Sequence, residues 1–141
     1  MIVQYIKKLS GPFLDRIDLQ ISVGTLAYND LESGPRSMTS EQMYQKVAKA
    51  HALQKIRNKG ILNGLLTPEQ IKAHCVLGDG SKRIIELAFE KLHLTMRGYN
   101  KVLRIARTIA DIEGFQDIQE PHLKEAFMYR SIDKQLERFN Y

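Results

Sequence analysis

The chain lacks the features that mark a secreted protein, a metalloprotein or a membrane protein. Cys75 is its single cysteine, so the 141 residues contain no CxxC pair and no disulfide framework. No apolar run approaches the roughly 20 residues that a membrane span requires, and the N-terminus has no signal-peptide stretch. The histidines have no acidic partner at metal-ligand spacing: His51, His74, His93 and His122. We expect a soluble cytoplasmic protein without a metal site, in which Cys75 is a buried thiol.

Signatures of independent catalysis are also missing. The segment Gly78-Asp79-Gly80-Ser81-Lys82 shares letters with a phosphate-binding loop but not its spacing, and it predicts a turn followed by a helix cap at Ser81. No nucleophile elbow, HExxH motif or kinase signature occurs. The chain is therefore not expected to hold Mg-ATP or to catalyse a reaction unaided.

What is present describes a single soluble domain with a core of its own. Hydrophobic residues make up 43% of the sequence and charged residues 26%. The formal net charge is +5 and the isoelectric point is about 9.4. This balance favours polyanionic partners, either nucleic acid or nucleotide phosphates, and charge alone does not choose between them.

The first 38 residues differ from the rest. Residues 1–23 predict a short basic helix over 4–9, a Ser-Gly-Pro break and a strand over 18–23, in which Leu19, Ile21 and Val23 alternate. An isolated strand is not stable in water, so this segment predicts the edge of a sheet whose remainder lies elsewhere. Residues 24–38 are rich in Gly, Asn, Ser and Pro and predict a linker.

Residues 39–141 predict a mainly α domain, a compact bundle of about five helices. Thr39 with Gln42, and Thr67 with Gln70, form capping boxes that open helices ending near Arg57 and Cys75. Further helices are expected from Ser81, from Met96 and from Pro121, with residues 132–141 extending the last or fraying. The first helix is expected to turn four residues inward: Met43, Val47, Ala50 and Leu53.

The helix from Met96 to Glu113 separates an apolar face from a basic one. Six residues gather on the apolar face, namely Tyr99, Val102, Leu103, Ala106, Ile109 and Ala110, and three cations gather on the opposite face, namely Arg97, Lys101 and Arg104. Thr95 is a natural N-cap, which places Arg97 where the helix dipole disfavours a cation by roughly 0.3 to 1 kcal/mol. Asp111 and Glu113 are equally unfavourable at the opposite end, before Gly114.

A cation beside unpaired N–H groups is explained if a phosphate binds between them, because a helix N-terminus and an arginine fork together make a phosphate site. The alternative is a solvated basic face without a ligand. Arg16 poses the same choice. It stands between a Gly-Pro break and the predicted strand, either in an ordinary surface ion pair with Asp15 or Asp18 or directed at the phosphate of another molecule.

Three stretches of sequence resemble the magnesium-chelatase-like AAA+ ATPases of the ComM/YifB type. SGPFLDRID at 10–18 resembles the signature SGPxLDRID of that family. LTMRGYNKVLRIARTIADIEG at 94–114 is similar to LSARAYHRILRVARTIADLEG, and His122-Leu123-Lys124-Glu125-Ala126 with Tyr129-Arg130 resembles HLxEAxxYR. The likeness covers nearly the whole chain and is weakest over 25–37.

This resemblance implies that the chain is the C-terminal part of a larger protein. Residues 1–23 would be the finger segment and last strand of an AAA+ core, 24–38 a linker, and 39–141 the helical lid. Arg16 would match the arginine finger, which contacts ATP on a neighbouring subunit. Arg97 would match the sensor-2 arginine, acting in cis or in trans. Gly98 replaces the usual alanine and should loosen the first helical turn by about 1 kcal/mol.

The resemblance further implies a homo-hexameric motor that uses ATP and Mg²⁺ in its full-length form and drives branch migration of DNA, with no membrane partner and no tight nucleotide binding by this segment alone. The motor subunit of a magnesium chelatase is the alternative within the superfamily. A different class remains open, a self-contained helical nucleic-acid binder that uses five cations: Lys46, Lys49, Arg97, Lys101 and Arg104. A protein-interaction module is a third reading.

Overall fold

The computed structural model describes residues 16–21, 23–25, 38–92 and 94–129. They form five α-helices and one short 3₁₀ helix: α4 (Ser40–Arg57), η1 (Asn63–Leu65), α5 (Pro68–His74), α6 (Asp79–Leu92), α7 (Met96–Glu113) and α8 (Glu120–Met128). The mainly α, five-helix prediction is therefore confirmed. The predicted helix over 4–9, most of the linker and the segment 132–141 fall outside the described residues, and the three-part domain division stays a prediction.

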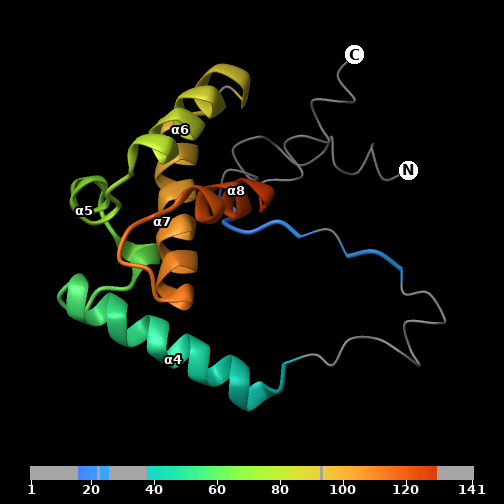
Figure 1. Ribbon diagram of the computed structural model, residues 1–141, viewed down its shortest axis with the longest axis vertical. Coiled ribbons are helices and arrows are strands. Elements are labelled where there is room, and N and C mark those ends of the chain that lie inside the picture. Colours follow the sequence, from blue (N-terminus) through green and yellow to red (C-terminus); the bar gives the residue numbers. More distant parts are fainter. Residues whose placement is uncertain (1–15, 22, 26–37, 93, 130–141) are drawn as a thin grey trace.

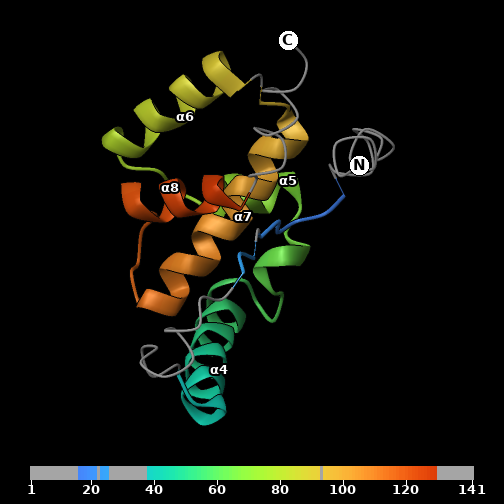
Figure 2. The ribbon, with the colours of Figure 1, turned by 90° about the vertical axis from the view of Figure 1, so that its right-hand side faces the viewer.

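Helix α7 is the centre of the arrangement. In both views of the ribbon α7 runs through the middle of the molecule, and α8 lies across it (Figure 1, Figure 2). Helices α4 and α5 also contact α7, whereas α6 packs against α8. A parallel bridge between Leu77 and Ile118 joins the loop before α6 to the loop before α8. Contacts with α4, α5, η1 and α8 therefore fix the position of α7 and of the side chains on its uncovered side.

The hydrophobic core follows the predicted apolar face of α7. Val102, Ala106 and Ala110 are completely buried, and Leu103 and Ile109 are nearly so, while Tyr99 is half-buried against the core. The facing residues come from the other elements, among them Leu66, Ile71, Ile85, Ile118, Leu123 and Ala126. Cys75 lies in the same core, as expected. The predicted apolar face of α7 is therefore confirmed. The prediction succeeded because apolar residues recur with the helical period along the whole of α7.

Local capping signals located most helix starts correctly. Both predicted capping boxes are present: Thr39 with Gln42, and Thr67 with Gln70. Thr95 accepts a hydrogen bond from the backbone N–H of Gly98 and caps α7, which ends at Gly114 in the left-handed conformation with φ of 81°.

The predicted cap at Ser81 is wrong. Helix α6 begins at Asp79, so Ser81 lies within its first turn, where its buried hydroxyl donates a hydrogen bond to the Ile118 carbonyl at 3.2 Å. This long-range acceptor attracts the serine to the interior, whereas its sequence context had suggested a helix boundary.

The packing of α4 also differs from the prediction. Ala50 is buried as expected, but Met43 and Val47 are nearly half-exposed and Leu53 is 37% exposed. The buried partners of Ala50 on α4 are polar, Gln54 and then Asn58 at the C-cap. Only the C-terminal part of the helix reaches the body of the molecule, and the first turns extend away from it (Figure 1). The apolar residues along α4 therefore do not all contact the core.

The strand predicted over 18–23 does not form in the described residues. Leu19, Ile21 and Val23 are 51%, 68% and 89% exposed. Residues 17–20 instead follow the outer side of α7, where the N–H of Gln20 donates to the Tyr129 carbonyl at 2.9 Å. The alternating pattern is typical of a sheet edge, but a strand needs a ladder with other strands, and in the described residues this segment contacts helices instead. Within the described ranges, no helix is long and apolar enough to cross a membrane.

Candidate functional site

Arg97 lies in the first turn of α7 with its side chain exposed. The Thr95 hydroxyl satisfies the N–H of Gly98, and the Thr95 carbonyl accepts from Tyr99, so the N–H groups of Met96 and Arg97 are those that helix geometry leaves unpaired. No described residue forms a hydrogen bond or an ion pair with the Arg97 guanidinium. A cation and two outward N–H groups at the positive end of the helix form a local environment suited to phosphate oxygens.

The other two cations of this face bond to the chain itself. The Lys101 ammonium donates to the Ile17 carbonyl at 2.8 Å and lies 3.8 Å from the Asp18 carboxylate, and its side chain is 11% exposed. Arg104 donates through Nη2 to the Leu66 carbonyl at 2.5 Å, while its buried Nε has no partner in the described part of the chain. These contacts hold the segment before the linker and the segment before α5 against α7.

Arg16 is exposed, directly before the residues that contact α7. Asp15, one of the partners considered for it, lies outside the described residues, and Asp18, the other, faces Lys101. The structure therefore brings the backbone at Arg16 to the helix that carries Arg97, with Lys101 as the link. Arg16 and Arg97 are far apart in the sequence.

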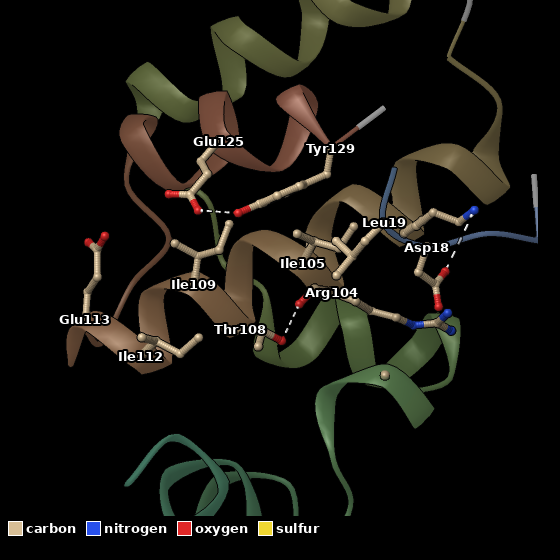
Figure 3. A pocket seen from close by; sticks show the side chains of 12 residues that line it. Asp18, Leu19, Arg104, Ile105, Thr108, Ile109, Ile112, Glu113, Glu125 and Tyr129 are labelled. Atoms are coloured by element: carbon tan, nitrogen blue, oxygen red, sulfur yellow. Dashed lines mark hydrogen bonds and ion pairs between the residues drawn. The ribbon is translucent and has the colours of Figure 1, made fainter. Parts of the chain in front are cut away.

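A groove of about 350 Å³ runs along α7 beside this link (Figure 3). Its wall is apolar, formed by three isoleucines of α7 (Ile105, Ile109 and Ile112), with Leu19 above Ile105. Asp18 and Arg104 lie at one end of the groove. Tyr129 of the α8 C-terminus donates to Glu125 at 2.9 Å, and this hydrogen bond raises the pKa of the tyrosine.

The acids at the C-terminal end of α7 have structural partners. Asp111 is 1% exposed and accepts hydrogen bonds from Arg57, from Asn63 at 2.8 Å and from Arg107 at 3.2 Å. Arg107 also donates to the carbonyls of Phe115 and Gln116, both at 2.6 Å, and so fixes the α7–α8 loop. Burial lowers the pKa of the Arg107 guanidinium, while the neighbouring carboxylate opposes that shift. The unfavourable position of Asp111 in the helix dipole is therefore offset by contacts with residues that lie outside the last turn of α7.

Glu113 and His122 form a second structural pair. His122 is buried, its Nε2 lies 2.9 Å from Glu113 Oε2, and its Nδ1 lies 2.9 Å from the backbone nitrogen of Gln119. The Gln119 N–H can only donate, so Nδ1 accepts and Nε2 carries the hydrogen that Glu113 accepts. His122 therefore caps α8 through a contact that spacing did not predict. No group of three described His, Cys, Asp or Glu residues is placed to hold a metal ion.

The five cations of the nucleic-acid hypothesis do not form one surface. Lys49 of α4 lies beside Gly114, at the C-terminal end of α7, whereas Arg97 lies at the N-terminal end. The length of α7 separates these ends by about 25 Å at 1.5 Å per residue. Lys101 and Arg104 lie between them, and both bond to backbone carbonyls. This distribution favours separate roles for the basic residues.

The sequence contained one overlooked signal for the buried network. Arg107 and Asp111 are four residues apart, the spacing at which helix side chains pair. Each comes directly after a residue of the apolar face of α7. Arg57, Asn63 and Gln54 join them across long sequence separations, which spacing cannot show. The contact of residues 17–20 with α7 had no sequence signal at all.

Comparison with known proteins places the chain in a family. The family described as magnesium chelatase, subunit ChlI C-terminal, matches residues 37–130, and the family described as magnesium chelatase, subunit ChlI, matches residues 1–31. Competence protein ComM of Haemophilus influenzae is 41% identical over 140 residues, which cover 99% of this chain and 27% of that protein.

Two further relatives are YifB of Salmonella typhimurium and YifB of Escherichia coli. They are 37% and 36% identical over 95% of this chain and 26% of their own length. The chain thus spans about a quarter of the length of these relatives, and the matching region contains both Arg16 and Arg97. The chain belongs to the magnesium chelatase ChlI C-terminal family and is similar to ComM and YifB.

Proposed function

We propose that this chain is the helical lid and finger segment of a ComM/YifB-type AAA+ ATPase, a ring-shaped hexameric motor that acts on DNA. Arg97 serves as the sensor-2 arginine and binds a phosphate of ATP. Arg16 serves as the arginine finger and reaches ATP on a neighbouring subunit. The rest of the full-length protein supplies the phosphate-binding loop and the Mg²⁺ ligands, which this sequence lacks.

The observation that carries the proposal is the exposed Arg97 in the first turn of α7, beside the two outward N–H groups. A phosphate at that position gains a charge-assisted hydrogen bond from the guanidinium and the favourable end of the helix dipole. The residues present therefore fit a nucleotide phosphate. A bound phosphate would also offset the helix-dipole penalty of Arg97, and no other group in the described residues does so. Arg16 is exposed as well, as a finger for a second subunit must be.

The chemistry of these residues is electrostatic. When ATP is bound, Mg²⁺ and the phosphate loop of the core supply the charge that holds the β- and γ-phosphates. Arg16 and Arg97 stabilise the negative charge that develops on the transferred phosphoryl group, and neither needs to exchange a proton. Guanidinium groups suit this task because they remain charged at every physiological pH.

The test is ATP hydrolysis by the full-length protein with Arg16→Ala or Arg97→Ala. A finger arginine contributes roughly 10³ to 10⁵ in rate, so turnover should fall by orders of magnitude in the Arg16 variant and strongly in the Arg97 variant. Arg83→Ala, an exposed arginine on α6, is the matched control and should retain turnover. Normal hydrolysis by both site variants would refute the proposal.

The magnesium chelatase motor subunit is a second candidate, favoured by the description of the matching family. The two functions differ in what stimulates the ATPase. A DNA motor should hydrolyse ATP faster when branched DNA is added and should move the branch point. A chelatase motor should be indifferent to DNA and should respond to a tetrapyrrole-binding partner subunit.

A further inference from the structure

Residues 17–20 form a strap across the outside of α7 and α8. At one end of the strap the Lys101 ammonium donates to the Ile17 carbonyl at 2.8 Å, and at the other end the Gln20 N–H donates to the Tyr129 carbonyl at 2.9 Å. Between these two bonds Leu19 lines the isoleucine groove beside Ile105 (Figure 3). A four-residue segment with a polar bond at each end and an apolar contact in the middle is fixed in position relative to α7.

The strap begins one residue after Arg16, and its first anchor lies one turn after Arg97. Lys101 follows Arg97 by four residues, an axial rise of about 6 Å on the same face of α7. The Lys101 side chain is 11% exposed, so most of its surface is covered by the protein, and its ammonium contacts the Ile17 carbonyl and the Asp18 carboxylate. The two arginines of the proposed function are therefore connected through one lysine.

We infer that Lys101 is a positioning residue, which sets where Arg16 lies relative to Arg97. This inference rests on the proposed function for the roles of the two arginines, but the connection is a property of the described residues. A shift of α7 when Arg97 meets a phosphate is passed through Lys101 to the backbone at Ile17. The position of Arg16, which contacts a neighbouring subunit, then depends on whether Arg97 binds a nucleotide phosphate.

The chemistry of the link requires a cation with a long stem. The ammonium bonds a carbonyl and faces a carboxylate, and methionine keeps the stem length while losing both contacts. Arginine retains the charge and the donors. Lys101→Met and Lys101→Arg are therefore a matched pair, and Lys91→Met, an exposed lysine of α6, controls for loss of a charge elsewhere.

The first experiment measures the geometry without any activity. Spin labels on Arg16→Cys and Met96→Cys in a Cys75→Ala background report the distance between strap and helix by double electron–electron resonance. We expect a narrow distance distribution that Lys101→Met broadens or shifts and that Lys101→Arg and Lys91→Met leave narrow. An unchanged distribution in Lys101→Met overturns the inference.

The second experiment measures ATP hydrolysis in the full-length protein. Lys101→Met should lower kcat at least tenfold with little change in KM for ATP, and Lys101→Arg should restore most of it. Because Lys101 acts through Arg16, adding Lys101→Met to Arg16→Ala should cause no further loss, whereas a general structural defect would multiply the two losses. Multiplied losses, or normal turnover in Lys101→Met, overturn the inference.

The two proposals fail in distinguishable ways. If Arg16→Ala and Arg97→Ala both retain turnover, the proposed function fails, and the distance measurement still decides whether the strap depends on Lys101. If the arginine variants lose turnover while Lys101→Met behaves like Lys91→Met, the function stands and the positioning role is refuted.

Discussion

The carboxylate of Asp111 accepts two hydrogen bonds from the guanidinium of Arg57, which precedes it by 54 residues. This pair joins the end of α4 to the end of α7, and Arg107 and Asn63 bond to the same carboxylate. The end of α7 opposite Arg97 is thus anchored by charge. An anchored end and an exposed first turn suit a helix that presents one cation to a ligand.

Replacing Asp111 should be among the most destabilising single changes. Asp111→Ala leaves Arg57 and a fully buried Arg107 without a counter-ion, which costs about 3 to 5 kcal/mol in comparable buried pairs. Urea unfolding followed by circular dichroism should show the midpoint fall accordingly. The exposed Asp117→Ala is the control, expected within about 0.5 kcal/mol of the wild type. Equal midpoints for both variants would show that the network does not stabilise the fold.

His122 should be held as one neutral tautomer. Its Nδ1 accepts from the Gln119 N–H and its Nε2 donates to Glu113, so the hydrogen belongs on Nε2. Long-range ¹H–¹⁵N spectra at pH 8 should show this tautomer for His122, whereas the exposed His51 should show averaged nitrogen shifts. His122→Ala should cost about 1 kcal/mol or more, because the cap of α8 is lost. A hydrogen found on Nδ1 would contradict the capping contact.

Cys75 should be unreactive at neutral pH and should make the fold sensitive to alkali. Burial raises the pKa of its thiol to about 11 from an ordinary value of 9.0, so the native state disfavours the thiolate. The thiol contribution to stability is complete below pH 9 and is lost as the pH rises towards 11, by about 2 to 3 kcal/mol.

The measurement for Cys75 is urea unfolding between pH 8 and 11, compared with Cys75→Ala. Burial raises the pKa of Tyr99 and the charge of Cys75 raises it further, so the difference between the two proteins measures the thiol together with its effect on Tyr99. Labelling by a thiol reagent at pH 8 should be slow in the native protein and fast in denaturant. A native thiol that labels as fast as the unfolded one would contradict the buried placement.

Two leucines on the apolar faces of α4 and α7 should differ strongly in their importance. Leu103→Ala, at 2% exposure, should cost about 2 to 5 kcal/mol because it leaves a cavity in the core. Leu53→Ala, at 37% exposure on α4, removes the same atoms from a site with little packing and should cost less than about 1 kcal/mol. Thermal or urea unfolding of the two variants measures these losses of stability. Similar losses for the two variants would mean that α4 packs as its periodicity suggested.

The sequence by itself determined the features that depend on neighbouring residues. Capping hydroxyls, the glycine after Glu113 and the complete apolar periodicity of α7 act between neighbouring residues, so spacing was enough to place those helix ends and that core face. The exposed position of Arg97 followed from the same local geometry. The family resemblance drawn from three motifs was confirmed by the match over residues 37–130.

The tertiary structure decided every feature that depends on distant partners. Ser81 lies inside a helix because the Ile118 carbonyl accepts its hydroxyl, and Asp111 is buried because Arg57 reaches it from α4. Residues 17–20 follow α7 because Lys101 and Tyr129 offer them polar partners. The physical reason is that burial and long-range hydrogen bonds depend on which surfaces meet, and one-dimensional spacing does not contain that information.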